Sequence, residues 1–202
     1  MSKARVEAFS DGVIAIAITL LVLSIHVPTP GPGGLAHELG REWPSFAAYV
    51  VSFLSIGVIW INHHAMLRRL VAVDHTMLTL NLLLLLILGI LPWSTALMAN
   101  FLRASSGQHL AAAVYAGSFL AMAVAFIAMQ GYAMAHPALL RAELDPAARR
   151  SIIRRNRVGS VPYVLAIAAA ALSSYLTLAI CAAVVVFYAL PRTTADPVRD
   201  GS

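Results

Sequence analysis

The chain begins with the run RVEAFSDGVIAIAITLLVL, residues 5–23, which places a carboxylate inside a hydrophobic segment. Asp11 follows Arg5 by about two turns, and the apolar residues continue beyond it without a break. A charge at the centre of a membrane helix costs roughly 2.5–3.5 kcal/mol on insertion scales, so it faces a partner helix or a water-filled path. The run therefore predicts a first membrane span whose polar residues have a structural or functional role.

The composition of the whole chain agrees with this prediction. Of the 202 residues, 60% are hydrophobic and 11% are charged, against about 25% charged residues in a soluble domain. Because a span needs about 20 apolar residues, we expect an all-α integral membrane protein with six spans in one domain, residues 1–191. The expected spans are about 6–27, 45–67, 76–100, 110–135, 156–172 and 174–190, followed by a short cytoplasmic tail, 192–202.

The positions of the basic residues predict the orientation. With the N-terminus inside and six spans, only Arg41 and Arg103 of the 14 basic residues fall outside. Such an asymmetry is typical of cytoplasmic N- and C-termini. The membrane topology thus accounts for the basic residues that produce the high isoelectric point, so these residues do not indicate nucleic-acid binding. The basic segment 141–157 reads either as an amphipathic helix close to anionic headgroups or as a solvated loop whose charges set the topology.

Polar residues from three spans fall at one depth near the cytoplasmic side. Buried polar groups without partners are costly, so we expect an interhelical network, with Trp60 nearby, of Ser10, Asp11, Asn62, His63, His64 and Asn81. This network is interpreted as a structural clamp, a proton or metal site, or a vestibule that senses charge. Adjacent histidines on a helix point about 100° apart, which disfavours a shared metal ion. We predict no metal site and no cofactor.

The first helix has two different faces. At 100° per residue, Gly12, Thr19, Leu20 and Leu23 lie within about 60° of Ile16, whereas Asp11 lies nearly opposite. The stripe around Ile16 is therefore apolar with one hydroxyl. Such a stripe most often faces lipid or another helix. The alternative is that it lines a narrow hydrophobic pore.

The first-helix run resembles the first-helix signature of the endolysosomal potassium-channel family, in particular its bacterial members with a single repeat. The WINHH run at 60–64 and the NLLLLL run at 81–86 are similar to the family's second- and third-helix motifs. The resemblance is specific through about residue 93 and extends to the later helices only in hydrophobic character. The TVGYG filter of ordinary potassium channels does not occur here.

The resemblance implies a homotetramer in the bacterial cell membrane, with a potassium-preferring pore along the fourfold axis lined by helix 1. It implies that Ile16 forms the constriction, that Leu20 and Leu23 form further apolar layers, and that Thr19 supplies a pore hydroxyl. It places Arg5, Phe9, Ser10 and Asp11 in the signature motif. It makes their packing partners Trp60, Asn62, His63, His64 and Asn81.

Two other classes remain open from the residues. A proton-coupled secondary transporter would use Asp11 and the His63/His64 pair, although the chain shows neither an internal repeat nor a midplane site. A membrane enzyme would need a metal or haem at one histidine, and no third ligand of suitable spacing appears. We therefore expect a channel and not an enzyme, with K+ as the permeant ion.

Overall fold

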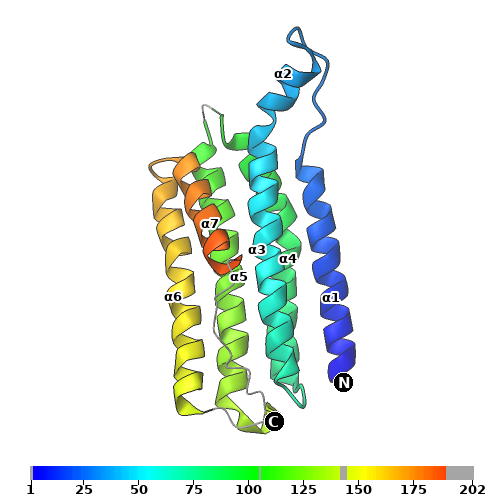
Figure 1. The fold of residues 1–202 in the computed structure, drawn as a ribbon, viewed down its shortest axis with the longest axis vertical. Coiled ribbons are helices and arrows are strands. Elements are labelled where there is room, and N and C mark those ends of the chain that lie inside the picture. The colour runs from blue at the N-terminus through cyan, green and yellow to red at the C-terminus, as the bar shows by residue number, and fades with distance from the viewer. Residues whose placement is uncertain (1, 105, 142–144, 190–202) are drawn as a thin grey trace, which may run out of the picture.

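Long apolar runs form the helices of a bundle in the computed structural model, which describes residues 2–104, 106–141 and 145–189 (Figure 1). Four helical segments are long and apolar enough to cross a membrane, and these are Lys3–Ser24, Trp43–Arg68, His75–Phe101 and Gln108–Ala135. They correspond to α1 (Lys3–Leu20) with the 3-10 turn η1 (Leu21–Ser24), α3 (Trp43–Arg68), α4 (His75–Phe101) and α5 (Gln108–Ala135). The chain is therefore an all-α membrane protein, as its composition predicts.

Two further helices complete the bundle. The helix α6 (Pro146–Ala170) is apolar only over Val158–Ala170, and α7 (Ser174–Ala189) is apolar over Ser174–Tyr188. The two helices run in opposite directions beside each other (Figure 1). A short helix α2 (Gly34–Arg41) stands above the bundle, and the 3-10 turn η2 (Pro137–Leu139) follows α5.

Two boundaries differ from the sequence expectation. The first span ends at Ser24 rather than near residue 27, since the backbone at Ile25 is already extended. The helix α6 begins ten residues before its expected span, so the basic segment continues directly into the apolar part. Hydropathy marks the apolar part of a helix, but arginines do not break a helix. The expected tail, with Arg192 and Arg199, lies outside the described residues.

A buried polar chain joins three helices in the half of the bundle nearest α2. The Thr95 hydroxyl on α4 donates to the Ser52 oxygen on α3 at 2.8 Å. Ser52 in turn lies 3.0 Å from the hydroxyl of Tyr115 on α5. All three side chains are buried. Polar groups inside a membrane protein need such partners because no water reaches them.

The loops at the opposite end are tied together by backbone pairing. Val71 N–H donates to the Leu139 carbonyl at 2.9 Å, and Arg141 N–H donates to the Arg69 carbonyl at 2.8 Å. Asp74 accepts from Tyr132 Oη at 2.6 Å and from Met77 N–H at 2.8 Å. These two bonds, that of Tyr132 first, hold the pKa of Asp74 below its usual range. The α3–α4 loop is thereby fixed to the end of α5.

Tyr115→Phe removes a hydroxyl from the buried polar chain and should destabilise the protein by about 1 kcal/mol, the net worth of a typical hydrogen bond. The readout is the thermal midpoint of the detergent-solubilised protein. Tyr175→Phe removes the same atom from a side chain that is 47% exposed and should leave the midpoint unchanged. Equal midpoints for wild type and Tyr115→Phe would contradict a stabilising role for this bond.

Candidate functional site

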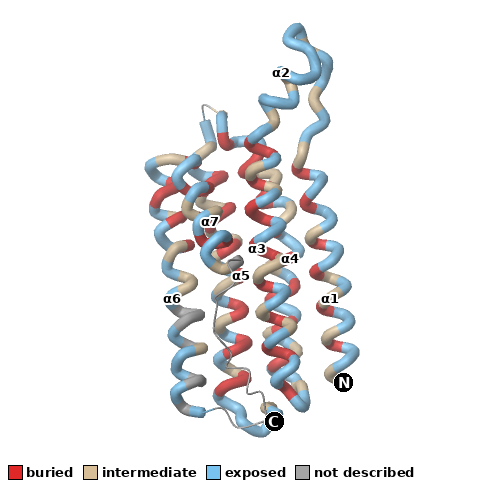
Figure 2. The backbone as a smooth tube through the Cα atoms, viewed as in Figure 1, coloured by how far each residue is buried: buried red, intermediate tan, exposed pale blue. Residues whose placement is uncertain are grey.

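The helix α1 lies at one edge of the bundle and packs against α3 and α4 (Figure 1). One face of it is buried, with Val6, Ser10, Ile14 and Ala17 at helical spacing. Figure 2 shows these buried positions alternating along α1 with exposed ones. The expected division of α1 into two faces is therefore present in the structure.

A chain of hydrogen bonds fixes the buried face of α1. His63 Nε2 on α3 lies 2.8 Å from Asn81 Oδ1 on α4, and since that oxygen only accepts, the imidazole donates. The Asn81 amide donates to Ser10 Oγ at 2.9 Å. Ser10 then donates to the carbonyl of Val6, one turn earlier, at 2.8 Å. All three side chains are buried, so this chain locks three helices together.

The two acidic residues of α1 have different partners on α3. Asp11 Oδ1 accepts from Trp60 Nε1 at 2.8 Å. Glu7 Oε1 lies 3.2 Å from His64 Nδ1, which has no hydrogen-bond partner among the described residues. The pair is close enough for an ion pair, which forms only where the imidazole is protonated. These contacts do not link Asp11 to a histidine, so they do not favour the proton relay of a transporter.

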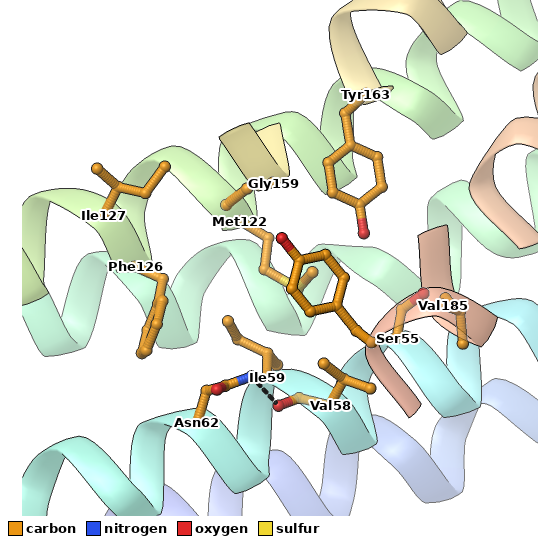
Figure 3. Close-up of a pocket in the computed structure, with 12 residues that line it drawn as sticks. Ser55, Val58, Ile59, Asn62, Met122, Phe126, Ile127, Gly159, Tyr163 and Val185 are labelled. Carbon is orange, nitrogen blue, oxygen red and sulfur yellow. Dashed lines mark hydrogen bonds between the residues drawn. The ribbon is translucent and has the colours of Figure 1, made fainter. Parts of the chain in front are cut away.

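The remaining residues expected at the site do not take part in these hydrogen bonds. Asn62 donates to the Val58 carbonyl on its own helix at 2.8 Å. It lines a pocket between α3, α5, α6 and α7 (Figure 3). Arg5 and Phe9 are exposed on α1. Sequence reasoning passed over Glu7 as a partner, although it precedes Asp11 by one turn on the same helix.

The other face of α1 has no cover within the described subunit. Ile16 is 60% exposed and Leu23 is 75% exposed, with Leu20 between them at 43%. Thr19 is also exposed, and its hydroxyl donates to the Ile16 carbonyl at 2.8 Å. That bond uses the hydroxyl proton and leaves the oxygen lone pairs free to accept from water or to contact a cation.

The described residues contain no group of three His, Cys, Asp or Glu side chains placed to hold a metal ion. Cys181 is buried and unpaired by disulfide. The polar residues of the site thus form hydrogen bonds to each other. The site combines a buried clamp, formed by Ser10, His63 and Asn81, with an uncovered apolar stripe on the other face of α1.

The comparisons with known proteins give the class of this arrangement as an ion channel. Residues 5–92 match the family model described as endosomal/lysosomal potassium channel TMEM175. A protein named a potassium channel from Streptomyces collinus is 45% identical over 98% of this chain and 96% of its own length. The chain belongs to the TMEM175 family, which confirms the resemblance; its relatives here are ion channels and not enzymes.

A solved structure and an animal relative extend the comparison. The crystal structure of a lysosomal potassium-selective channel TMEM175 homolog from Chamaesiphon minutus superposes with a TM-score of 0.84 at 37% identity, over 93% of this chain and 96% of that one. The mouse endosomal/lysosomal proton channel TMEM175 is 41% identical over 51% of this chain, and the match covers 22% of the mouse protein.

Asn81→Leu should destabilise the bundle by about 1–3 kcal/mol, because it leaves the buried His63 and Ser10 groups without their shared partner. The measurement is the thermal midpoint in detergent, with folding checked by circular dichroism. Asn100→Leu, on the same helix, removes an exposed amide bonded to the Ala96 carbonyl and serves as the matched control. A loss no larger than that of the control would show that the clamp contributes nothing to stability.

Proposed function

We propose that this protein is a potassium-preferring cation channel in the bacterial cell membrane. In the proposal, four copies surround a pore lined by the exposed stripe of α1, and each copy contributes six spans with both termini in the cytoplasm. The observation that carries it is the uncovered apolar stripe of an edge helix that is firmly clamped on its other face. Support also comes from the family and from relatives named as potassium channels.

The clamp and the stripe suit complementary roles in such a pore. A pore wall must hold its position, and the hydrogen bonds of Ser10 and Asp11 fix α1 to α3 and α4. The residue facing the axis at the narrowest point would be Ile16. A ring of isoleucines offers an ion no oxygen ligand, so it would gate by excluding water. Leu20 and Leu23 would form further apolar layers.

Thr19 is the polar exception on the stripe. Because its proton is held by the Ile16 carbonyl, its oxygen presents lone pairs outward, and four such oxygens would form a ring that favours cations over anions. A potassium ion keeps its water more loosely than a smaller cation, so a narrow apolar constriction followed by a hydroxyl ring would favour potassium. The selectivity should be modest beside that of a filter made of carbonyl oxygens.

The distribution of charge supports the proposed orientation. Lys3, Arg5, Arg68, Arg69 and Arg141 all lie at the end of the bundle where α1 begins, whereas Arg41 and Arg103 lie at the other end. We refer to the former as the arginine-rich end. Cytoplasmic segments carry an excess of Lys and Arg, which supports placing this end in the cytoplasm.

The direct test is ion flux from liposomes that contain the purified protein. Vesicles loaded with potassium chloride and diluted into sodium chloride should develop a potential, inside negative, that a potential-sensitive dye reports without any proton gradient. The same vesicles with equal potassium on both sides and a pH gradient test for protons as the permeant ion. No potential in the potassium arm from intact, oligomeric protein would overturn the proposal, and a potential in the pH-gradient arm alone would make protons the permeant ion instead.

Ile16→Asn should raise potassium flux several-fold, because an amide ring wets the constriction. Leu86→Asn is the matched control, since Leu86 on α4 is 63% exposed against 60% for Ile16. Flux through this control should equal that of wild type. If Ile16→Asn keeps the oligomer and conducts no better than wild type, Ile16 is not the gate.

A further inference from the structure

The pocket that Asn62 enters is formed by four helices and lies away from the clamp. Its lining includes Ser55 and Ile59 on α3, Met122 and Phe126 on α5, and Tyr163 on α6 (Figure 3). Its volume is about 80 Å³, and most of its lining is aliphatic or aromatic. An empty apolar recess forfeits dispersion contacts, so an apolar occupant would stabilise the bundle.

The short last helix shapes this pocket. The helix α7 has 16 residues, against 26 in α3 and 25 in α6. Its described part ends before the arginine-rich end of α3 and α6 (Figure 1). Val185 and Tyr188, in its last two turns, line the pocket. A Cβ at Gly159 would collide with the Tyr188 hydroxyl, so this glycine is what allows Tyr188 to reach across α6.

Arginine lies beyond the pocket on the same face of α3. Arg69 follows Asn62 by seven residues, which places it on the same helical face about 10 Å nearer the arginine-rich end. Arg69 is the C-cap of α3, with backbone angles in the right-handed helical region, and its side chain is exposed. Within the described residues no carboxylate forms an ion pair with Arg69. Arg150 and Arg154 of α6 are exposed too, but at 100° per residue they lie on the face of α6 opposite Gly159 and Tyr163, so they do not border the pocket.

Backbone pairing fixes the Arg69 end of α3. The hydrogen bond from Arg141 N–H to the Arg69 carbonyl, and the bridge between Leu70 and Leu140, join the end of α3 to the segment before α6. The positive charge of Arg69 is thereby held about 10 Å from the apolar recess, on the same face of α3. Basic residues at a membrane surface attract anionic headgroups within a Debye length.

We propose that this recess binds an anionic phospholipid of the leaflet at the arginine-rich end. The end of one acyl chain occupies the pocket between α3, α5 and α6, and its phosphate lies at Arg69. The occupant is a lipid because the recess is apolar and lies within one acyl chain's length of Arg69, whose charge is not paired by a carboxylate of the described residues. This proposal does not depend on the ion that the channel conducts.

Binding of added lipid to the delipidated protein in detergent, counted per chain by native mass spectrometry, tests the proposal. Phosphatidylglycerol and phosphatidylcholine with the same acyl chains are the two probes. We expect one phosphatidylglycerol per chain, bound at least several-fold more tightly than phosphatidylcholine. Equal binding of the two lipids, or no saturable binding, overturns the proposal.

Two matched pairs of variants locate the lipid. Ala123→Trp fills the recess and should abolish binding, whereas Val124→Trp, on the neighbouring residue that is 53% exposed, should bind as wild type. Arg69→Gln should lower the affinity for phosphatidylglycerol to that for phosphatidylcholine, whereas Arg68→Gln removes the same charge from a different helical face and should change it much less. The arginine pair leaves the packing intact, so it decides the question even if Ala123→Trp does not fold. Equal losses for Arg69→Gln and Arg68→Gln would overturn the assigned position.

Discussion

Asn81 uses both ends of its amide to hold the first helix in place. Its carbonyl oxygen accepts from His63 on α3, and its nitrogen donates to Ser10 on α1. Inside a bilayer a polar group without a partner costs several kcal/mol, because no water replaces the missing bond. This constraint couples three helices: none of them can shift along its axis without leaving one of the polar groups unsatisfied.

The same constraint is met a second time toward the other end of the bundle. There Thr95 of α4 bonds to Ser52 of α3, which contacts Tyr115 of α5. The helix α4 is thus fixed at two heights, and α3 takes part in both polar chains. The apolar contacts between these anchors are non-directional, so the hydrogen bonds set the register in which the helices pack.

Much of this arrangement was predictable from the sequence. The division of α1 follows from the helical period, since Ser10 and Ile14 fall on one side and Ile16 and Leu23 on the other. The shared depth of Ser10, His63 and Asn81 in the membrane could be predicted by counting residues inward from the helix ends. Periodicity is enough for both features because each depends on one regular helix and on the position of the membrane surface.

Other features depend on which helices become neighbours, and a single sequence does not specify that. Asn62 adjoins His63 in the chain, but the rotation of about 100° between them turns it to the pocket. Tyr115 appeared in an apolar run with nothing to mark Ser52 as its partner. The early start of α6 was missed because the arginines lower hydropathy without ending a helix.

The hydrogen bond between Ser10 and Asn81 also bears on how the chain is made. The two residues are 71 positions apart, so at about 5–20 residues per second the ribosome needs roughly 4–14 s to add Asn81 after Ser10. During that interval the first helix has no amide with which to pair. During synthesis the protein therefore passes through a stage in which the insertion machinery or nearby water must accommodate the polar residues of α1. The integration of α1 is complete only when α4 has been made.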